Sequence, residues 1–466
     1  MNDSPGPGAV PAPEPRTSPA FAVFRMGAPL ALGLASHALV NLVDLLLVGR
    51  LGEGAVQAAH VASTWNFLPM ILGNCVATAL LARLARLLGR NELALARGVH
   101  RRAEWFAVWL GVVVSVSSAV AAPWMVDSTG LSGAVAADAR HYLVVSNLGC
   151  LPMFVLMQTT AAMRAAGEVA MPLVLLVGAN LLNLGLDLVL LFGFGPLGIP
   201  AVGVAGAAYA SVAARAVAAV VAWWWLGDRG HVLSLRDAEP RPGVAVVVPL
   251  LHDAWPQIVQ IGLRAALVLA LTVVVQHEHG DSATAALGVA TRLDTVILFA
   301  SLGFANAATV VAGRAVVVGD ERTARAAGWW AAVQAGVFGL LVALLLRAFP
   351  AEVTALFVPV APAAMVALVA LYFRTAIFAQ VLSATTLGAI GAVHGAGRMV
   401  APLVVDLVGF AVAFGLLGAA ADRGLEALYG ALVLGMAVTG SLHLGFVALG
   451  RWPRALPAEV PAGLPD

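Results

Sequence analysis

Residues 27–52 read GAPLALGLASHALVNLVDLLLVGRLG and are almost entirely apolar. A helix needs about 20 apolar residues to cross a bilayer, so this stretch is long enough to span a membrane. It nevertheless carries an aspartate, Asp44, well inside the apolar run. An ionisable side chain at that depth is costly, and such residues commonly mark the path of an ion or a substrate. Pro29 lacks an N–H group and predicts a bend in the same helix.

The composition of the whole chain agrees with this first stretch. Of the 466 residues, 61% are hydrophobic and 11% are charged, whereas a soluble domain has about 25% charged residues. The sequence therefore predicts an integral membrane protein. Lysine is absent, which excludes a P-loop nucleotide site, because that motif requires a lysine. The two cysteines, Cys75 and Cys150, lie in apolar stretches and are interpreted as reduced packing residues.

The apolar stretches predict an all-α integral membrane protein with twelve transmembrane helices, arranged as two pseudo-symmetric six-helix bundles around a central cavity. We expect the spans near 25–50, 56–83, 104–126, 139–163, 169–194, 199–226, 254–277, 283–312, 324–348, 360–390, 399–421 and 426–450. The predicted parts are a disordered cytoplasmic tail (1–24), a first lobe (25–226), a cytoplasmic linker (227–253), a second lobe (254–450) and a cytoplasmic tail (451–466).

Arginines predict the orientation of these spans. If the N-terminus lies in the cytoplasm, 18 of the 26 arginines fall in segments that are cytoplasmic. Four lie outside, namely Arg50, Arg140, Arg347 and Arg423, and the remaining four lie within spans. Cytoplasmic loops of membrane proteins carry an excess of arginine and lysine. We therefore expect a multi-pass protein of the bacterial inner membrane with both termini in the cytoplasm.

The two halves of the chain resemble each other in sequence. Residues 164–173 read RAAGEVAMPL, and residues 394–403, which lie 230 positions later, read HGAGRMVAPL. An offset of about half the chain indicates duplication of a six-span unit. Because six is even, the two copies have the same orientation in the membrane, and parallel repeats of this kind commonly enclose a central site.

Two acidic residues in the first lobe form the predicted functional site. Asp44 and Asp187 each lie about 18 residues from the start of a span that enters from the cytoplasm, or ~27 Å along the helix. Asn41 and Asn183 lie three and four residues before these acids, which predicts a shared helix face. Together with Asn180, they predict a cation site lined by oxygen atoms. The alternative is that the acids only form hydrogen bonds between helices.

We expect this site to couple transport to a cation. Two neighbouring buried carboxyl groups favour binding of a proton, because one proton relieves their mutual repulsion. Loss of that charge would let the helix repack and bend at Pro29. A proton is the favoured ion, and Na⁺ at Asp44, Asn183 and Asp187 is the alternative.

Other polar residues within spans are weaker candidates. The candidate cavity-lining residues are Tyr209, Asn147, Gln158 and Gln257, and Ser211 is a candidate for completing the cation site. Asp294 is interpreted as a structural residue, with Arg264 as one candidate partner, whereas Asp406 has no partner nearby in the sequence. Residues 277–279, His-Glu-His, are interpreted as a solvated loop and not as a metal site, because a metal would need further ligands at suitable spacing.

Several segments resemble the multidrug and toxic compound extrusion (MATE) family. These are LVDLLLVGRLG at 42–52, NLLNLGLDLVLLFG at 180–193 and GVAGAA at 203–208. The resemblance covers essentially the whole chain. It implies twelve spans in two lobes and a secondary antiporter that expels amphipathic, often cationic compounds in exchange for H⁺ or Na⁺.

The second lobe departs from one branch of that family. Sodium-coupled members carry acids in spans 7 and 10, where this chain has Gln257, Gln260 and Arg264, and Arg374 and Gln380. This departure favours coupling through the first lobe. An alternative is a flippase for lipid-linked intermediates. An enzyme is not expected, because no H-E-x-x-H or nucleophile–base pair is present, and we expect no cofactor apart from the coupling ion. The expected partners are small organic substrates and the lipid bilayer, with no nucleic acid, and we expect a monomer.

Overall fold

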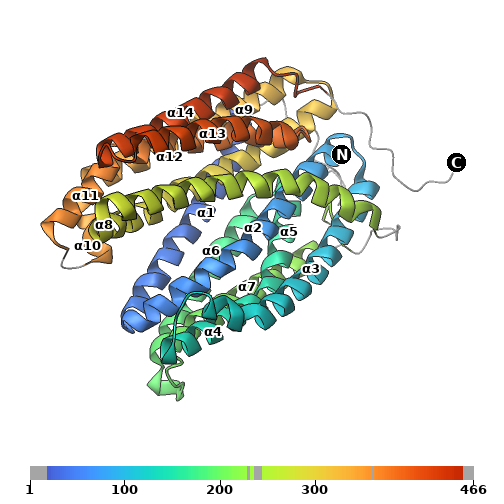
Figure 1. Cartoon of the computed structure of the whole chain (residues 1–466). Coiled ribbons are helices and arrows are strands. Elements are labelled where there is room, and N and C mark those ends of the chain that lie inside the picture. The colour runs from blue at the N-terminus through green and yellow to red at the C-terminus, as the bar shows by residue number, and fades with distance from the viewer. Residues whose placement is uncertain (1–17, 228–230, 236–243, 359–360, 455–466) are drawn as a thin grey trace. The chain divides into compact units, whose positions relative to one another are not determined.

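A computed structural model describes residues 18–227, 231–235, 244–358 and 361–454 (Figure 1). Its α-helices are α1 (Pro19–Gly49), α2 (Glu53–Gly89), α3 (Leu93–Asp127), α4 (Gly133–Leu148), α5 (Cys150–Ala166), α6 (Ala170–Phe192), α7 (Val204–Leu226), α8 (Val244–Val317), α9 (Glu321–Ala348), α10 (Pro350–Phe357), α11 (Ala363–Arg374), α12 (Ile377–Gly395), α13 (Val400–Ala420) and α14 (Leu425–Leu449). A short 3-10 helix, η1 (Gly195–Leu197), precedes α7. The predicted all-α membrane fold is confirmed.

The helices and the predicted spans do not correspond one to one. In the described residues, eleven helical stretches are long and apolar enough to cross a membrane. The stretch in α8 has 71 residues, about 105 Å of helix, which far exceeds the ~30 Å thickness of a bilayer core. It holds two spans, joined at Gly280, whose φ of 74° and ψ of −171° suit a residue without a Cβ. The predicted loop between spans 7 and 8 is thus reduced to a kink.

The chain divides into two compact units, here called unit 1 and unit 2. In the described part of the chain, unit 1 contains residues 36–254, and unit 2 contains residues 18–35 and 255–454. The boundary crosses α1 at Ala35 and Ser36, whereas the sequence placed all of span 1 in the first lobe. Helix α1 therefore belongs to both units.

The first part of α1 is held in unit 2 by close backbone packing. An ideal Cβ built on Gly303 of α8 would lie 2.3 Å from the Ala31 nitrogen, so only glycine permits this approach. A Cβ on Gly27 would lie 2.6 Å from the Phe304 ring. Pro29 lies between these two contacts, inside a helix that continues through it. The bend predicted at Pro29 thus falls in the part of α1 that packs in unit 2.

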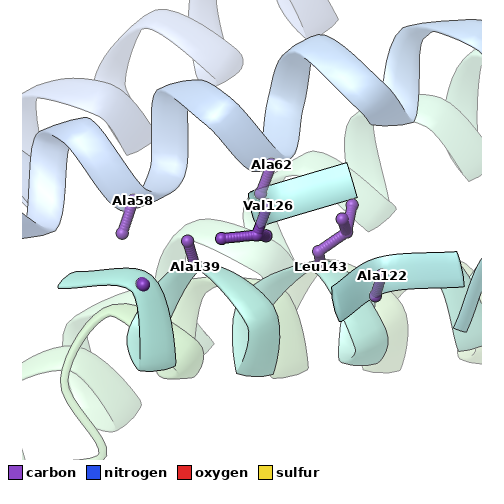
Figure 2. Close-up of a cluster of buried hydrophobic side chains, with 7 residues drawn as sticks. Ala58, Ala62, Ala122, Val126, Ala139 and Leu143 are labelled. Carbon is purple, nitrogen blue, oxygen red and sulfur yellow. The ribbon is translucent and has the colours of Figure 1, made fainter. Parts of the chain in front are cut away.

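Small side chains bring the helices of unit 1 together. A buried cluster joins α2, α3 and α4 (Figure 2) and consists of Ala58, Ala62, Ala122, Val126, Ala136, Ala139 and Leu143. Helices in lipid gain little from hydrophobic burial against each other, so their association depends on close packing. Alanines at these positions let the three helices approach closely.

The turn before α6 and the turn before α13 confirm the internal repeat in the structure. Gly167 (φ 91°) and Gly397 (φ 78°) are 230 residues apart, and both are left-handed. In each turn, the next backbone N–H donates to the carbonyl five residues earlier, from Glu168 to Met163 and from Arg398 to Val393. This is the hydrogen bond of a Schellman motif, which needs glycine at the left-handed position.

The packing of α12 against α8 predicts that a methyl group added at Gly391 destabilises the protein. A Cβ on Gly391 would lie 2.2 Å from the Ala305 carbonyl oxygen of α8, whereas Gly415 of α13 has no neighbour within 4 Å. We expect Gly391→Ala to lower the free energy of unfolding by about 1–3 kcal/mol, the usual effect of overpacking. Thermal unfolding in detergent measures the change. Gly415→Ala is the matched control, and an equal loss there would contradict the packing explanation.

Helix α9 begins with a charged cap that predicts a pH-dependent stability. The backbone N–H of Thr323 donates to Asp320 Oδ1 at 3.0 Å, and this bond, aided by the Thr323 hydroxyl, lowers the pKa of Asp320. The bond therefore stabilises α9 at pH values above the unfolded-state pKa of about 4, and its contribution is lost as the pH falls through the lower folded-state pKa. Asp320→Ala should cost about 1 kcal/mol at pH 7. The difference in the free energy of unfolding between Asp320→Ala and the unaltered protein should shrink as the pH is lowered below about 4. A difference that stays constant with pH would contradict the role of the charged cap.

Candidate functional site

The structure brings Asp44 of α1 and Asp187 of α6 together in unit 1. Their carboxyl groups lie within reach of a shared hydrogen bond. Asp187 is completely buried, and Asp44 is half-buried. Asn183 Nδ2 donates to Asp187 Oδ2 at 3.1 Å and lies 3.3 Å from Ser211 Oγ of α7. Three helices, α1, α6 and α7, therefore position the polar groups of the site.

The sequence of α6 explains why its polar groups face inward. Asn180, Asn183 and Asp187 are spaced by three and four residues, so they lie on one face of the helix, and all three are buried. Leu181 and Leu188 are exposed on the opposite side. Burial of the polar stripe with partners avoids the cost of unpaired polar groups in an apolar environment. This pattern fixes the rotation of α6 about its axis.

A second pair of polar groups joins the same two helices, about two helical turns before the acids. His37 Nδ1 lies 3.1 Å from Asn180 Oδ1, and Asn180 Nδ2 donates to Ser36 Oγ at 3.2 Å. His37 precedes Asp44 by seven residues, and Asn180 precedes Asp187 by seven. His37 and Ser36 were not among the residues predicted from the sequence. The seven-residue spacing from Asp44 is the signal that places His37 on the same helix face.

Each of the two carboxyl groups keeps one oxygen atom available. In the part of the chain that the structure describes, Asp44 Oδ1 and Asp187 Oδ1 are buried without a hydrogen-bond partner. Buried polar atoms are normally satisfied, so such atoms in a native fold call for an explanation. Arg215 of α7 lies close enough to Asp44 for their charges to attract. Chemically, this arrangement can bind a proton or a small cation between two carboxylates.

The three asparagines predicted for the cation site differ in their placement. Asn183 and Asn180 lie at the site, but Asn41 is exposed. Among the described hydrogen bonds, none joins Asn41 to Asp44 or Asp187. In the described residues, Asn41 is therefore not among the buried polar groups that join α1 to α6.

Three of the four candidate cavity-lining residues have buried side chains. Asn147 and Gln158 are buried, and Gln158 Nε2 donates to the Gly73 carbonyl at 3.3 Å. Gln257 is also buried, with Nε2 3.5 Å from Met399 Sδ. All three side chains are thus buried in the structure, and their role in lining a central cavity stays a prediction. Tyr209 is 42% exposed, and its hydroxyl lies 3.0 Å from His141 Nε2.

Polar residues of unit 2 also differ from the sequence-based expectation. Arg264 Nη1 donates to Ser383 Oγ, whereas Asp294 accepts from the Tyr372 hydroxyl. The suggested pairing of Arg264 with Asp294 is therefore wrong. Tyr372 is fixed by an edge-on contact with Tyr429, with ring centroids 5.4 Å apart. Buried Asp294 thus has a structural partner from span 10.

Curated proteins from several bacteria are similar to this chain. A "Probable multidrug resistance protein NorM" of Deinococcus radiodurans is 28% identical over 442 residues, which cover 91% of this chain and 94% of the relative. The protein of the same name from Brucella suis is 26% identical over 91% of this chain and 93% of the relative. That of Agrobacterium fabrum is 26% identical, but the match spans only 64% of each protein.

Solved structures share the fold. "Crystal structure of MATE in complex with MaL6" superimposes with a TM-score of 0.85 at 21% identity and covers 93% of this chain and 96% of that one. "Outward-facing conformation of a multidrug resistance MATE family transporter of the MOP superfamily" gives a TM-score of 0.83 with the same identity and coverage. The MatE family model matches residues 29–189 and 256–417, once in each half. With more than half of its length matched in this duplicated pattern, the chain belongs to the MATE family of multi-pass membrane transporters.

Proposed function

We propose that this protein is an antiporter that exports amphipathic or cationic drug-like compounds in exchange for protons. It would act in the bacterial inner membrane with both termini in the cytoplasm. The names of the relatives support the substrate class, and the distribution of arginines supports the orientation. The observation that carries the proposal is the contact between the carboxyl groups of Asp44 and Asp187.

The contact explains how binding of an ion changes the protein. Two ionised carboxylates at one buried position repel each other, and a proton between them turns the repulsion into a hydrogen bond. Binding of the proton therefore favours close packing of α1 against α6, and its release favours separation. A cationic substrate competes for the same negative charge. Only one of the two ligands is then bound at a time, which is the requirement for exchange.

Helix α1 is suited to transmit this change. Its residues from Ser36 onward belong to unit 1 and include Asp44, whereas its residues before Ser36 belong to unit 2. Pro29 removes one backbone hydrogen bond in the unit 2 part and so lowers the cost of bending there. Bending at Pro29 would let the part of α1 that carries Asp44 move while the part before Pro29 stays packed in unit 2.

The set of donor atoms supports a proton over Na⁺ as the coupling ion. Asp187 Oδ2 already accepts from Asn183, and the Asn183 amide nitrogen faces the site. A proton needs only the two remaining oxygen atoms, Asp44 Oδ1 and Asp187 Oδ1, whereas a hard metal cation requires a larger shell of oxygen ligands.

Neutral variants of the two acids test the site. Asp44→Asn and Asp187→Asn should each reduce efflux of a fluorescent organic cation to the background of a pump-deficient host, because an amide cannot gain and lose the proton. Membrane expression is measured in parallel. Asp138→Asn, at an exposed position of α4, is the matched control and should keep full efflux. Retained efflux in both site variants would contradict the proposal.

A gradient experiment tests the ion. In liposomes that contain the purified protein, a pH gradient without sodium should drive uptake of the organic cation, and a sodium gradient at equal pH should not. The measurement is substrate fluorescence inside the vesicles. Transport driven by a sodium gradient alone would contradict proton coupling and identify Na⁺ as the ion that the two carboxylates bind.

A further inference from the structure

A second buried acid and a histidine face each other in unit 2. Asp406 of α13 and His443 of α14 are 3% and 1% exposed, and Asp406 Oδ1 lies 3.5 Å from His443 Nε2. Close packing of α13 and α14 produces the contact. A Cβ on Gly409 would lie 2.5 Å from Thr439 Oγ1, so glycine at that position lets the two helices approach. No role in the proposed exchange depends on these residues, which lie outside unit 1.

The hydrogen bonds of His443 determine which ring nitrogen carries hydrogen. Nδ1 lies 2.9 Å from the backbone carbonyl of Thr439, and a carbonyl can only accept, so Nδ1 is the donor. In a neutral imidazole, Nε2 is then a bare acceptor. It faces Asp406 Oδ1, which is also an acceptor, and the Pro402 carbonyl lies near the same ring. Among the described residues, Oδ1 and Nε2 have no hydrogen-bond partner.

Two positive or titratable groups complete the surroundings of the pair. Arg264 of α8 donates to Ser383 and lies near enough to Asp406 for their charges to attract. His394 of α12 is buried and lies within electrostatic range of His443. Arg264 therefore compensates the carboxylate when no proton is bound. Asp406 thus has a compensating positive charge nearby both with and without a bound proton.

We propose that Asp406 and His443 form a proton-binding site in unit 2, where a single proton bridges Oδ1 and Nε2. Uptake of the proton from water converts two facing acceptors into one charge-assisted hydrogen bond and adds one positive charge. Release returns the proton to water and leaves the two lone pairs opposed. The packing of α13 against α14 then depends on protonation. This site goes beyond the proposed function, which requires only the carboxyl pair of unit 1.

Nitrogen-15 NMR of histidine-labelled protein in lipid nanodiscs tests the site without any substitution in the observed molecule. The resonance of His443 is assigned by its loss in His443→Gln. As the pH is lowered from about 9 to about 5, the range in which an imidazole changes charge, Nε2 should change from a bare to a protonated nitrogen, while Nδ1 stays protonated. A ring that keeps one form across this range overturns the proposal.

A potentiometric titration tests whether both residues share the proton. Over the same pH range, His443→Gln and Asp406→Asn should each bind about one proton fewer per protein than the unaltered chain, and the double variant should lose no more than either single variant. His277→Gln, at an exposed histidine, calibrates the loss for one independent histidine. Its combination with His443→Gln should be additive. An additive loss in the Asp406 and His443 double variant overturns the proposal.

One further variant separates this site from the carboxyl pair of unit 1. Asp44→Asn should leave the change in the His443 resonance intact, because the charged and titratable groups near His443, namely Asp406, Arg264 and His394, all belong to unit 2. An unchanged His443 response together with lost efflux supports two separate sites. Loss of the His443 response in Asp44→Asn overturns the independent unit 2 site and leaves the exchange proposal standing.

Discussion

The paired polar faces of α1 and α6 are the constraint on which unit 1 depends. Polar side chains on a membrane-spanning helix are costly without partners, because water is absent. His37 with Asn180 and Asp44 with Asp187 form two levels, each separated by seven residues on both helices. This match fixes the register of the two helices. The same contact that determines the packing also places two acids side by side, so structure and proposed chemistry have one origin.

Helix packing elsewhere relies on residues with almost no side chain. Gly303 lies against the α1 backbone, and Gly391 lies against α8. Because apolar side chains gain as much from lipid as from each other, close backbone contact supplies the attraction. It also makes the contacts intolerant of added atoms. Close contacts of this kind hold the first part of α1 in place within unit 2.

The sequence predicted what local patterns determine and missed what depends on distant contacts. Apolar length revealed the spans, and two buried acids on spans 1 and 5 revealed the contact. The division of α1 between the units and the burial of Gln158 depend on neighbouring helices, which local patterns do not identify. Asn41 illustrates the limit on a finer scale: its spacing predicted a place beside Asp44, but its side chain is exposed, whereas Asn183 of α6 is buried. The partner of Arg264 likewise came from a span more than 100 residues away.

Duplication alone does not explain the buried acids. Under the offset of 230 residues, Asp187 corresponds to Leu417 and Asp406 corresponds to Leu176. The acid of unit 2 thus lies eleven residues earlier in its helix than the acid of unit 1, or ~16 Å nearer the start. Buried charges are costly and are rarely retained without a partner. Each acid therefore lies at a different position along its helix and meets different neighbours, Asn183 for Asp187 and His443 for Asp406.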